Sequence, residues 1–340
     1  MIIPFFITHA GCPHQCVFCN QKNITGENKP PDASSIHPSI SQYLEARRDN
    51  EAVQVAFYGG SFTALPLAAQ KAYLEAVRPF ITSGRVESIR ISTRPDGIST
   101  EVLALLKRSH VRTVELGVQS MDDDVLTRSG RGHTSADTLK AFNLLRARGF
   151  TLGLQLMPGL PGDTPETFQK TVSQVISLRP DFVRIYPALV IKETPLAELY
   201  RTGRYSPLSL DDAVLLCHKA VARFEQAGIE VIRVGLQPTE ELERPGTIIA
   251  GPWHPAFRQL VESSRFLEKM CSLLSAGDQA CTVTFFVNPA DLSSAIGQKR
   301  RNIHTIKDRS GMNAKIMADP EVPRGAVRKD PSCNARKVEL

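Results

Sequence analysis

The sequence predicts an α/β protein whose parallel strands form an open sheet or a barrel, followed by a separate small α+β domain. Short apolar or β-branched runs alternate with helical patterns from the N-terminus to about Ile191. The central runs are apolar enough to be covered on both faces, as are strands of a parallel sheet with right-handed crossovers. Beyond Val234 the composition changes, and proline and glycine interrupt the pattern.

The alternating region contains six predicted strands, at Ile2–Ile7, Val53–Tyr58, Ser88–Thr93, Val111–Val118, Thr151–Met157 and Phe182–Pro187. The helices predicted between them are Ile40–Arg48, Leu67–Phe80, Thr100–Ser109, Ala136–Arg148 and Thr164–Ser177. Ser99 and Thr164 stand where helix N-caps are expected, and Gly149 follows a predicted last turn. In either geometry the functional loops lie at the carboxyl ends of the strands.

The region after Ile191 is predicted to hold a helix from Asp211 to Gln226 and one more strand, Ile229–Val234. Farther along, the pattern predicts a helix near Phe257–Leu274, a strand near Ala280–Val287 and a helix at Leu292–Asp308. We therefore predict a core domain over residues 1–240, a connecting segment over 241–265, a small α+β domain over 266–322 and a basic, disordered tail over 323–340.

Composition predicts a cytoplasmic protein without a membrane segment. The chain has 340 residues and 42% hydrophobic content, and no run approaches the roughly 20 apolar residues of a membrane helix. Its first residues lack the features of a signal peptide. Between Gly297 and Leu340 eleven Lys or Arg face five Asp or Glu, which accounts for the net charge of +6. This bias indicates RNA as a polyanionic partner, with no DNA expected, or a solvated tail that aids solubility.

Three of the seven cysteines, Cys12, Cys16 and Cys19, have the spacing Cys-x3-Cys-x2-Cys. Clustered thiolates in a reducing compartment suit zinc or an iron–sulfur cluster. A closed zinc site needs four ligands, which His9 or His14 would have to complete. A cluster held by three cysteines instead leaves one iron open. The scattered cysteines do not suggest a second cluster: Cys217 is expected to be buried and Cys333 exposed.

Eight ordered motifs resemble those of radical S-adenosylmethionine (SAM) enzymes, and over the first 240 residues those of the radical SAM domain of the Elongator catalytic subunit. They are Cys12-Pro-His-Gln-Cys16-Val-Phe-Cys19, Phe57-Tyr-Gly-Gly-Ser-Phe62, Ser92-Thr-Arg-Pro-Asp96, Glu115-Leu-Gly-Val-Gln-Ser120, Arg131-Gly-His133, Met157-Pro-Gly-Leu-Pro-Gly162, Arg184-Ile-Tyr-Pro187 and Arg233-Val-Gly-Leu-Gln-Pro238.

The resemblance implies a partial (β/α)6 TIM-like barrel that binds a [4Fe-4S] cluster on Cys12, Cys16 and Cys19. SAM would bind the open iron and be cleaved reductively to methionine and a 5′-deoxyadenosyl radical, with electrons from a flavodoxin- or ferredoxin-like donor. A chamber of low polarity is expected to protect that radical. No acetyltransferase domain like that of the Elongator relatives fits after residue 240.

The resemblance also assigns residues to SAM. Gly59, Gly60 and Ser61 would approach its amino group, and Arg94, Gln119 and Ser120 its carboxylate or ribose. Phe18 would lie against the adenine or else pack its loop onto the core; Met157 and Tyr186 would be apolar walls of the site or ordinary core. Glu115 is expected to face the chamber or to pair with Arg94 or Arg184. No catalytic residue is assigned.

Residues 282–303 resemble the strand-helix-loop-helix core of a KH domain. In KH modules a Gly-x-x-Gly loop clamps the nucleic-acid backbone. Here Gly297-Gln-Lys-Arg300 has arginine at the second glycine position, and Gly297, Lys299, Arg300 and Arg301 are the predicted RNA contacts.

The resulting prediction is a radical SAM enzyme acting on RNA, with tRNA modification as the expected role. One alternative is a radical SAM oxidoreductase acting on a tetrapyrrole or another small molecule, because coproporphyrinogen oxidases share the Gly-Val-Gln-Ser and Gly-Leu-Pro-Gly motifs. The other alternative is a noncatalytic RNA-binding protein with a structural metal site.

Overall fold

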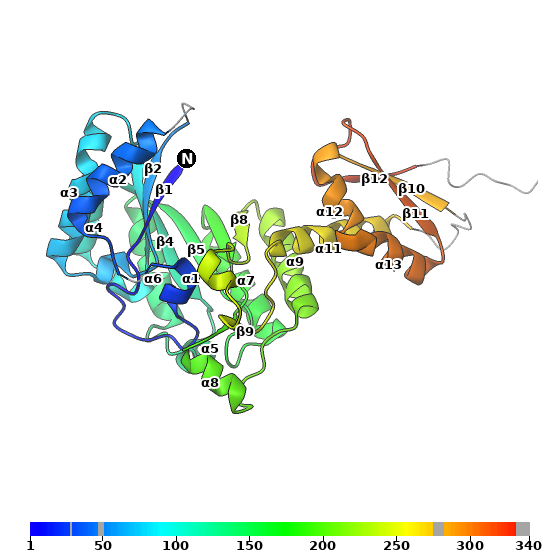
Figure 1. Cartoon of the computed structure of the whole chain (residues 1–340), viewed down its shortest axis with the longest axis horizontal. Coiled ribbons are helices and arrows are strands. Elements are labelled where there is room, and N and C mark those ends of the chain that lie inside the picture. The colour runs from blue at the N-terminus through cyan, green and yellow to red at the C-terminus, as the bar shows by residue number, and fades with distance from the viewer. Residues whose placement is uncertain (28, 47–50, 275–281, 331–340) are drawn as a thin grey trace, which may run out of the picture. The chain divides into compact units, whose positions relative to one another are not determined.

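The computed structural model describes residues 1–27, 29–46, 51–274 and 282–330. It divides into two compact units (Figure 1): unit 1 comprises residues 1–213 and 220–255, and unit 2 comprises residues 214–219 and 256–340. Cys281, Cys333 and residues 331–340 of the predicted tail lie outside the described residues. Within the described part, none of the helices has the length and apolar character needed to cross a membrane.

Unit 1 is built on a curled parallel sheet, as predicted. Its seven strands lie in the order β1-β2-β3-β4-β5-β6-β8 (Figure 1). They are β1 (Ile2–Phe6), β2 (Gln54–Tyr58), β3 (Ser88–Thr93), β4 (Val111–Gln119), β5 (Thr151–Leu156), β6 (Phe182–Ile185) and β8 (Glu230–Val234). All neighbouring strands are parallel. The partial barrel is thus confirmed, and the additional strand predicted near residue 230 completes it beside β6.

Four predicted helices follow strands of this sheet: α3 (Leu67–Thr82), α4 (Thr100–Arg108), α6 (Ser135–Ala147) and α7 (Pro165–Leu178). The predicted N-caps Ser99 and Thr164 precede α4 and α7. The Ser99 side chain accepts from the Val102 N–H at the start of α4. Thr134 and Thr164 form capping boxes at the starts of α6 and α7. These local bonds explain why their N-terminal boundaries were predictable to within a few residues.

The predicted helix at residues 40–48 begins too late. The observed α2 spans Ala33–Glu45 and includes Pro38. Proline usually ends a helix, so the pattern indicated a start beyond it. The helix nevertheless forms because Ile36 and Ile40, one turn apart, are both fully buried.

Short elements were missed because they are too short to show a periodic pattern. They are α1 (Gln21–Thr25), α5 (Asp123–Arg128), β7 (Val190–Ile191), α8 (Pro195–Arg201), α10 (Glu240–Glu243) and β9 (Ile248–Ala250). β7 and β9 pair antiparallel, so residues of the predicted connecting segment form part of unit 1. The longer α9 (Leu210–Gln226) matches its prediction.

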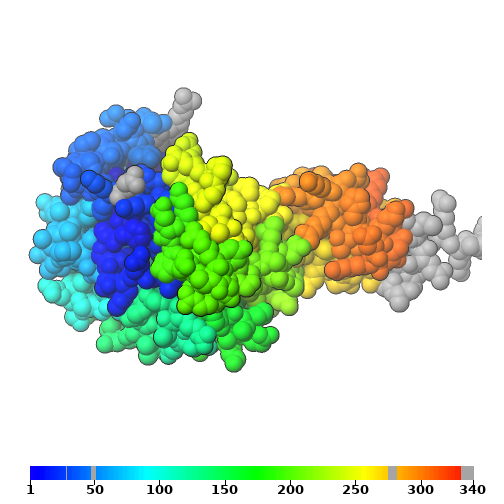
Figure 2. Space-filling view, turned by 60° about the horizontal axis from the view of Figure 1, so that its bottom comes forward, coloured from blue at the N-terminus to red at the C-terminus, as the bar shows by residue number. Residues whose placement is uncertain are grey.

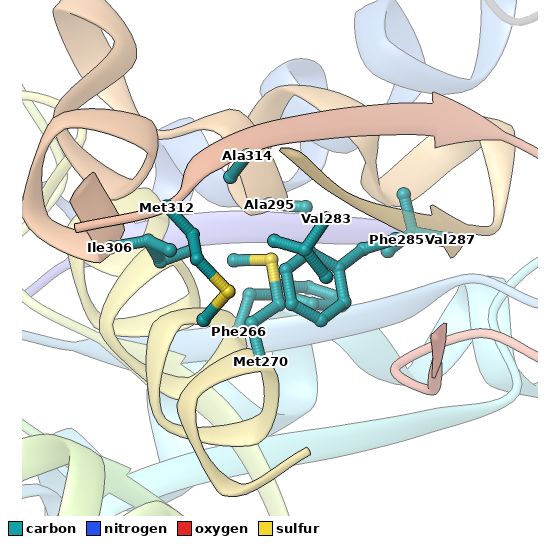
Figure 3. Close-up of a cluster of buried hydrophobic side chains, with 9 residues drawn as sticks. All are labelled: Phe266, Met270, Val283, Phe285, Val287, Ala295, Ile306, Met312 and Ala314. Carbon is teal, nitrogen blue, oxygen red and sulfur yellow. The ribbon is translucent and has the colours of Figure 1, made fainter. Parts of the chain in front are cut away.

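Unit 2 contains α11 (Phe257–Ser272), β10 (Thr282–Val287), α12 (Leu292–Ile296), α13 (Arg301–Ser310), β11 (Asn313–Ala318) and β12 (Val327–Lys329). The strand order is β11-β10-β12, with β10 parallel to β11 and antiparallel to β12. Its core is a cluster of nine buried side chains in which Phe266 and Met270 of α11 pack with Phe285 of β10 (Figure 3).

Two predictions for unit 2 are wrong. The single helix that the periodic pattern predicts at residues 292–308 is two helices, α12 and α13. They are separated at Gly297, whose φ is +77°, where the strand-helix-loop-helix resemblance implies a loop. Residues 327–329, inside the predicted disordered tail, form β12. The charged residues of this segment are typical of a disordered tail. In the structure the Arg328 guanidinium lies 4.7 Å from the centre of the Phe286 ring and pairs with Asp319, and these contacts hold the strand in place.

Candidate cofactor site

The loops that follow β1 to β4 meet at the carboxyl edge of the sheet in unit 1. The Ser61 N–H donates to the Ala10 carbonyl at 2.9 Å, and a Cβ at Gly60 would lie 2.5 Å from the carbonyl oxygens of Ile7 and Ala10. The loop after β1 therefore packs directly on the turn after β2, and only glycine fits at position 60.

The same loop is held by segments far along the chain. The Val17 N–H donates to the Ser129 carbonyl at 3.0 Å, and the Leu196 N–H donates to the Val17 carbonyl at 2.8 Å. Figure 2 shows the N-terminal segment, in dark blue, at the surface of unit 1 beside the green segment that contains α8. These two bonds hold the segment that carries Cys12, Cys16 and Cys19, here called the cysteine loop, to the segment after α5 and to α8.

The three clustered thiols interact electrostatically. Burial, and then the negative charges of Cys16 and Cys12, raise the pKa of the Cys19 thiol to about 12. Desolvation, and then the charge of Cys16, raise the pKa of Cys12, although that residue is exposed at the rim. Cys16 is buried. Neighbouring thiols resist ionising together, and a metal centre removes this repulsion by binding them as thiolates.

The donor set fits an iron–sulfur cluster. Within the described residues no three or more His, Cys, Asp or Glu side chains converge on the position of a single metal ion. In a cluster, however, each thiolate binds its own iron, so the three sulfurs need not converge. The His9 ring, a possible fourth zinc ligand, already accepts the Gln21 N–H through Nε2 at 3.0 Å.

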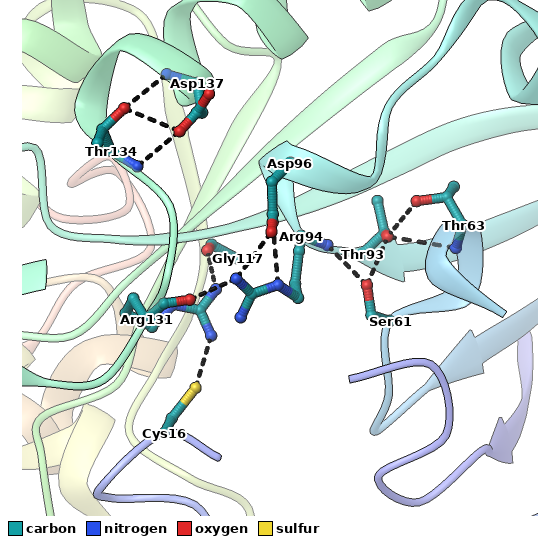
Figure 4. Close-up of polar contacts among 10 residues, drawn as sticks. All are labelled: Cys16, Ser61, Thr63, Thr93, Arg94, Asp96, Gly117, Arg131, Thr134 and Asp137. Carbon is teal, nitrogen blue, oxygen red and sulfur yellow. Dashed lines mark hydrogen bonds and ion pairs between the residues drawn. The ribbon is translucent and has the colours of Figure 1, made fainter. Parts of the chain in front are cut away.

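Two buried arginines, Arg94 and Arg131, interact electrostatically with the Cys12 thiol. Figure 4 shows both of them with Cys16. Arg131 Nη1 donates to Cys16 Sγ at 3.1 Å, and its Nη2 donates to the Gly117 carbonyl at 2.6 Å. Arg94 pairs with Asp96 through Nε at 2.9 Å and Nη2 at 3.0 Å, and its Nη2 also donates to the Arg131 carbonyl. Arg94 Nη1 is buried without a hydrogen-bond partner among the described residues, so it remains able to bind an added acceptor.

The hydroxyl groups of Ser61 and Ser120 form hydrogen bonds that connect neighbouring elements of unit 1. Ser61 Oγ lies 3.1 Å from Thr93 Oγ1 and accepts the Arg94 N–H at 3.3 Å, which ties the end of β2 to the end of β3 (Figure 4). Ser120 Oγ lies 3.3 Å from Thr171 Oγ1 of α7. Both hydroxyls are buried, so they stabilise the loops at this edge of the sheet from inside the protein.

Gln119 has an unusual backbone for a residue other than glycine, with φ of +68°. It follows an irregularity in the pairing of β4 with β5, and its Oε1 accepts from Gln155 Nε2 at 3.2 Å. A left-handed residue at a strand end costs about 1–3 kcal/mol and is typical of functional sites.

Two of the predicted apolar residues, Phe18 and Met157, pack on the same buried cluster. Phe18 packs on two buried clusters, one containing Val190 and Leu196 and the other containing Leu160, against which Met157 also packs. The Tyr186 N–H donates to the Leu156 carbonyl at 2.8 Å, and its hydroxyl accepts from Arg184 Nη1 at 3.3 Å. Packing of the loop onto the core is therefore one demonstrated role of Phe18.

The sheet carries a charged cluster, in contrast to the low-polarity chamber that was expected. Glu115 of β4 accepts from Arg90 of β3 at 2.9 Å and pairs with Arg184 of β6 at 2.7 Å. Tyr58 OH lies 3.4 Å from the same carboxylate. The predicted pairing of Glu115 with Arg184 is confirmed. The alternative pairing with Arg94 is wrong, because Arg94 is held by Asp96 two residues away.

The main omission among the predicted site residues is Arg131. Its motif, Arg131-Gly-His133, does not by itself indicate a role for the arginine. Nothing in the spacing places residue 131 next to residue 16, because the contact forms only when the segment after α5 folds back over the cysteine loop.

In unit 2 the predicted RNA contacts gather on the loop between α12 and α13. Lys299, Arg300 and Arg301 are exposed, whereas Gly297 is buried. A Cβ at Gly297 would lie 2.8 Å from Ser263 Oγ, and the Arg300 N–H closes the loop onto the Gly297 carbonyl at 3.0 Å. Lys299 and Arg300 have φ of +50° and +60°.

Comparison with known families gives two matches that together cover most of the described chain. A model of the radical SAM superfamily matches residues 6–175, and a model of the radical SAM C-terminal domain matches residues 180–266.

Individual relatives are more distant. A tRNA uridine(34) acetyltransferase from Methanocaldococcus infernus is 26% identical over 254 residues, covering 63% of this chain and 47% of that protein. The heme chaperone HemW of Bacillus subtilis is 26% identical over 197 residues, covering 57% of this chain and 52% of that protein. The chain thus spans about half the length of the curated relatives it matches. A solved structure of M. infernus Elp3 aligns with a TM-score of 0.61 at 22% identity, covering 79% of this chain and 63% of that one.

Proposed function

Because this chain belongs to the radical SAM superfamily, we propose that it is an enzyme that binds a [4Fe-4S] cluster and SAM at the rim of its half-barrel. The observation that supports the proposal is three electrostatically interacting thiols on one loop with two buried guanidinium groups beside them. When bound, the cluster supplies the electron that cleaves SAM to methionine and a 5′-deoxyadenosyl radical.

Different residues at this edge of the sheet would bind the cluster and SAM. Cys12, Cys16 and Cys19 would bind three irons. Arg94 is the best candidate to bind the SAM carboxylate, since Nη1 is its one buried nitrogen without a partner in the described chain. Asp96 holds the rest of that guanidinium in place.

The remaining contacts would come from the backbone and from apolar side chains. Gly59 and Gly60 bring bare backbone to the rim for the SAM amino group. Gln119 would bind the ribose or carboxylate, and Ser61 and Ser120, whose hydroxyls bond neighbouring elements, would support the backbone rather than bind SAM directly. Phe18, Met157 and Tyr186 would exclude water from the adenosyl group.

The test is to reconstitute the protein with iron and sulfide without oxygen, add SAM and reductant, and measure iron per chain and 5′-deoxyadenosine. We expect Cys12→Ser, Cys16→Ser and Cys19→Ser each to lose both readouts. Cys271→Ser, which changes a half-buried cysteine of unit 2, is the matched control and should lose neither. Full iron content without any 5′-deoxyadenosine would instead support a noncatalytic RNA-binding protein.

For the substrate we propose RNA, most specifically tRNA, gripped by unit 2 as a KH-like module. Two exposed cations at left-handed backbone positions, Lys299 and Arg300, present their side chains from a closed loop after a buried glycine. Such a loop suits contacts to phosphates. A relative named as a tRNA uridine(34) acetyltransferase supports the choice of tRNA.

Filter binding of radiolabelled tRNA at low salt tests this assignment. The double variant Lys299→Ala/Arg300→Ala should bind at least tenfold more weakly than the unmodified protein. Arg309→Ala/Lys315→Ala removes the same charge from exposed sites outside the loop and should bind nearly normally. Equal losses in both variants would show that general charge, and not the loop, binds RNA.

A tetrapyrrole is the second candidate substrate, supported by the similarity to a heme chaperone. The cluster of Arg90, Arg184 and Glu115 carries one more positive than negative charge, which suits a carboxylate-bearing ligand. Titration with hemin, followed by absorbance, distinguishes the two: Arg90→Gln should weaken hemin binding only if this second assignment is correct.

A further inference from the structure

Arg131 has a buried charge that meets no carboxylate in the described part of the chain. Only 6% of the residue is exposed, and its side-chain hydrogen bonds go to Cys16 Sγ and the Gly117 carbonyl. Arg94, by contrast, is neutralised by Asp96. A buried cation without a counter-ion is costly, so its presence calls for an anion at the same place.

Of the three cysteine sulfurs that become anionic on binding iron, that of Cys16 accepts a hydrogen bond from Arg131. We propose that Arg131 is a positioning residue that raises the reduction potential of the cluster through its hydrogen bond to Cys16 Sγ. This inference rests on the proposed cluster but assigns a role that does not depend on the substrate.

The guanidinium is held firmly enough for this role. Its Nη2 donates to the Gly117 carbonyl at 2.6 Å, and Gly117 leaves room because a Cβ there would lie 3.3 Å from that nitrogen. The backbone of Arg131 is fixed as well: its N–H donates to the Leu126 carbonyl at 3.0 Å, and its carbonyl accepts from Arg94 Nη2 (Figure 4).

The physical effect follows from charge. Reduction adds one electron from an external low-potential donor, a flavin or iron–sulfur protein, and makes or breaks no bond to Arg131. The added charge spreads onto the cysteine sulfurs, and a charged donor stabilises the more negative state more strongly. Hydrogen bonds to the sulfurs and net charge are among the determinants of cluster potentials. Removing the guanidinium should therefore make the cluster harder to reduce.

The experiment is a redox titration of reconstituted, SAM-free protein, followed by electron paramagnetic resonance. Omitting SAM ensures that any contact between Arg131 and SAM does not contribute. At the midpoint potential of the unmodified protein, Arg131→Gln should show at least a tenfold lower ratio of reduced to oxidised cluster, which is a shift of about 59 mV for a one-electron couple. Arg131→Lys, which keeps the charge but not the paired donors, should shift less.

Arg128→Gln is the matched control, because Arg128 is exposed on the same segment and already paired with Asp124. It should leave the midpoint unchanged. A midpoint in Arg131→Gln equal to that of Arg128→Gln overturns the inference. If Arg131→Gln fails to hold a cluster, Arg131→Lys decides: a midpoint below the control supports the proposal and an equal one rejects it. Absence of any cluster in the unmodified protein would reject the proposed function instead.

Discussion

Arg300 holds a backbone conformation that glycine would adopt at lower cost. Its φ of +60° follows that of Lys299 at +50°, so two consecutive side-chain-bearing residues are left-handed. Left-handed backbone costs a non-glycine residue about 1–2 kcal/mol. Arg300 thus adopts the left-handed geometry that is usual for glycine, and it adds a charge to the loop.

We therefore expect Arg300→Gly to have a free energy of unfolding about 1 kcal/mol higher than Arg300→Ala. Both variants remove the same charge, so their difference reports the backbone: the strain that glycine relieves in the folded loop, less the greater unfolded-chain entropy that glycine brings. Urea denaturation followed by circular dichroism measures it. Equal stabilities would show that the loop relaxes when the arginine is replaced.

The thiol of Cys19 should be unreactive in the folded, cluster-free protein. Burial and the neighbouring thiolates raise its pKa to about 12, from 9.0 in the unfolded chain. Iodoacetamide attacks the thiolate, so at pH 9 Cys19 should be alkylated at least tenfold more slowly in folded protein than in urea. The half-buried Cys271 is the reference in peptide mass spectrometry.

The same shift has a consequence for stability. Because the folded pKa is the higher one, the folded state binds more protons above pH 9, and the contribution of Cys19 to stability is present below that pH and lost as pH rises toward 12. Equal alkylation rates in folded and unfolded protein would contradict both statements.

At the scale of elements, the rim depends on how closely the loop after β1 approaches the turn after β2. The contact is between backbones, since the Ser61 N–H meets the Ala10 carbonyl and Gly60 lies beneath it. Ser61 continues the connection to β3. The cysteine loop can therefore take this position only because residue 60 has no side chain.

Gly60→Ala should displace the cysteine loop, because the added methyl group would lie 2.5 Å from two carbonyl oxygens. We expect a loss of about 1–3 kcal/mol in stability and several-fold less iron per chain after reconstitution. Gly84→Ala is the control: its φ of +73° strains alanine, but open space surrounds it, so the added methyl group meets no carbonyl oxygen. Iron content equal to that of the control would show that the loop does not need this contact.

At the scale of the whole molecule, the net positive charge is concentrated at one end of the chain. The excess of Lys and Arg over Asp and Glu in residues 297–340 equals the net charge of +6. The exposed loop of unit 2 carries part of this excess. A chain with this distribution should bind RNA in a salt-dependent manner.

The logarithm of tRNA affinity should fall linearly with the logarithm of salt concentration. Each phosphate contact contributes about −0.7 to the slope for single strands, so Lys299→Ala/Arg300→Ala should make the slope shallower by about 1.4. Arg309→Ala/Lys315→Ala should leave it nearly unchanged. A slope unaffected by the loop variant would place the RNA contacts elsewhere.

Much of this architecture was predictable because its signals are local. The alternating runs predicted all six of the first barrel strands, and the cap residues Ser99 and Thr164 placed two helices. The resemblance to the radical SAM domain of the Elongator catalytic subunit is confirmed by the family match and by the similarity to tRNA uridine(34) acetyltransferases. The helices α1, α5, α8 and α10 and the strands β7 and β9 were not predicted, because helices of less than two turns and strands of two or three residues show no clear periodic pattern.

By itself the sequence determined the parallel half-barrel, the radical SAM family and the cysteine loop, because hydrophobic period and motif spacing are properties of neighbouring residues. Only the tertiary structure decided that Arg94 pairs with Asp96, that Glu115 joins Arg90 and Arg184, and that Arg131 reaches Cys16. The last of these contacts joins residues 115 positions apart, and a buried charge selects its partner by proximity in the folded chain, which no local pattern encodes.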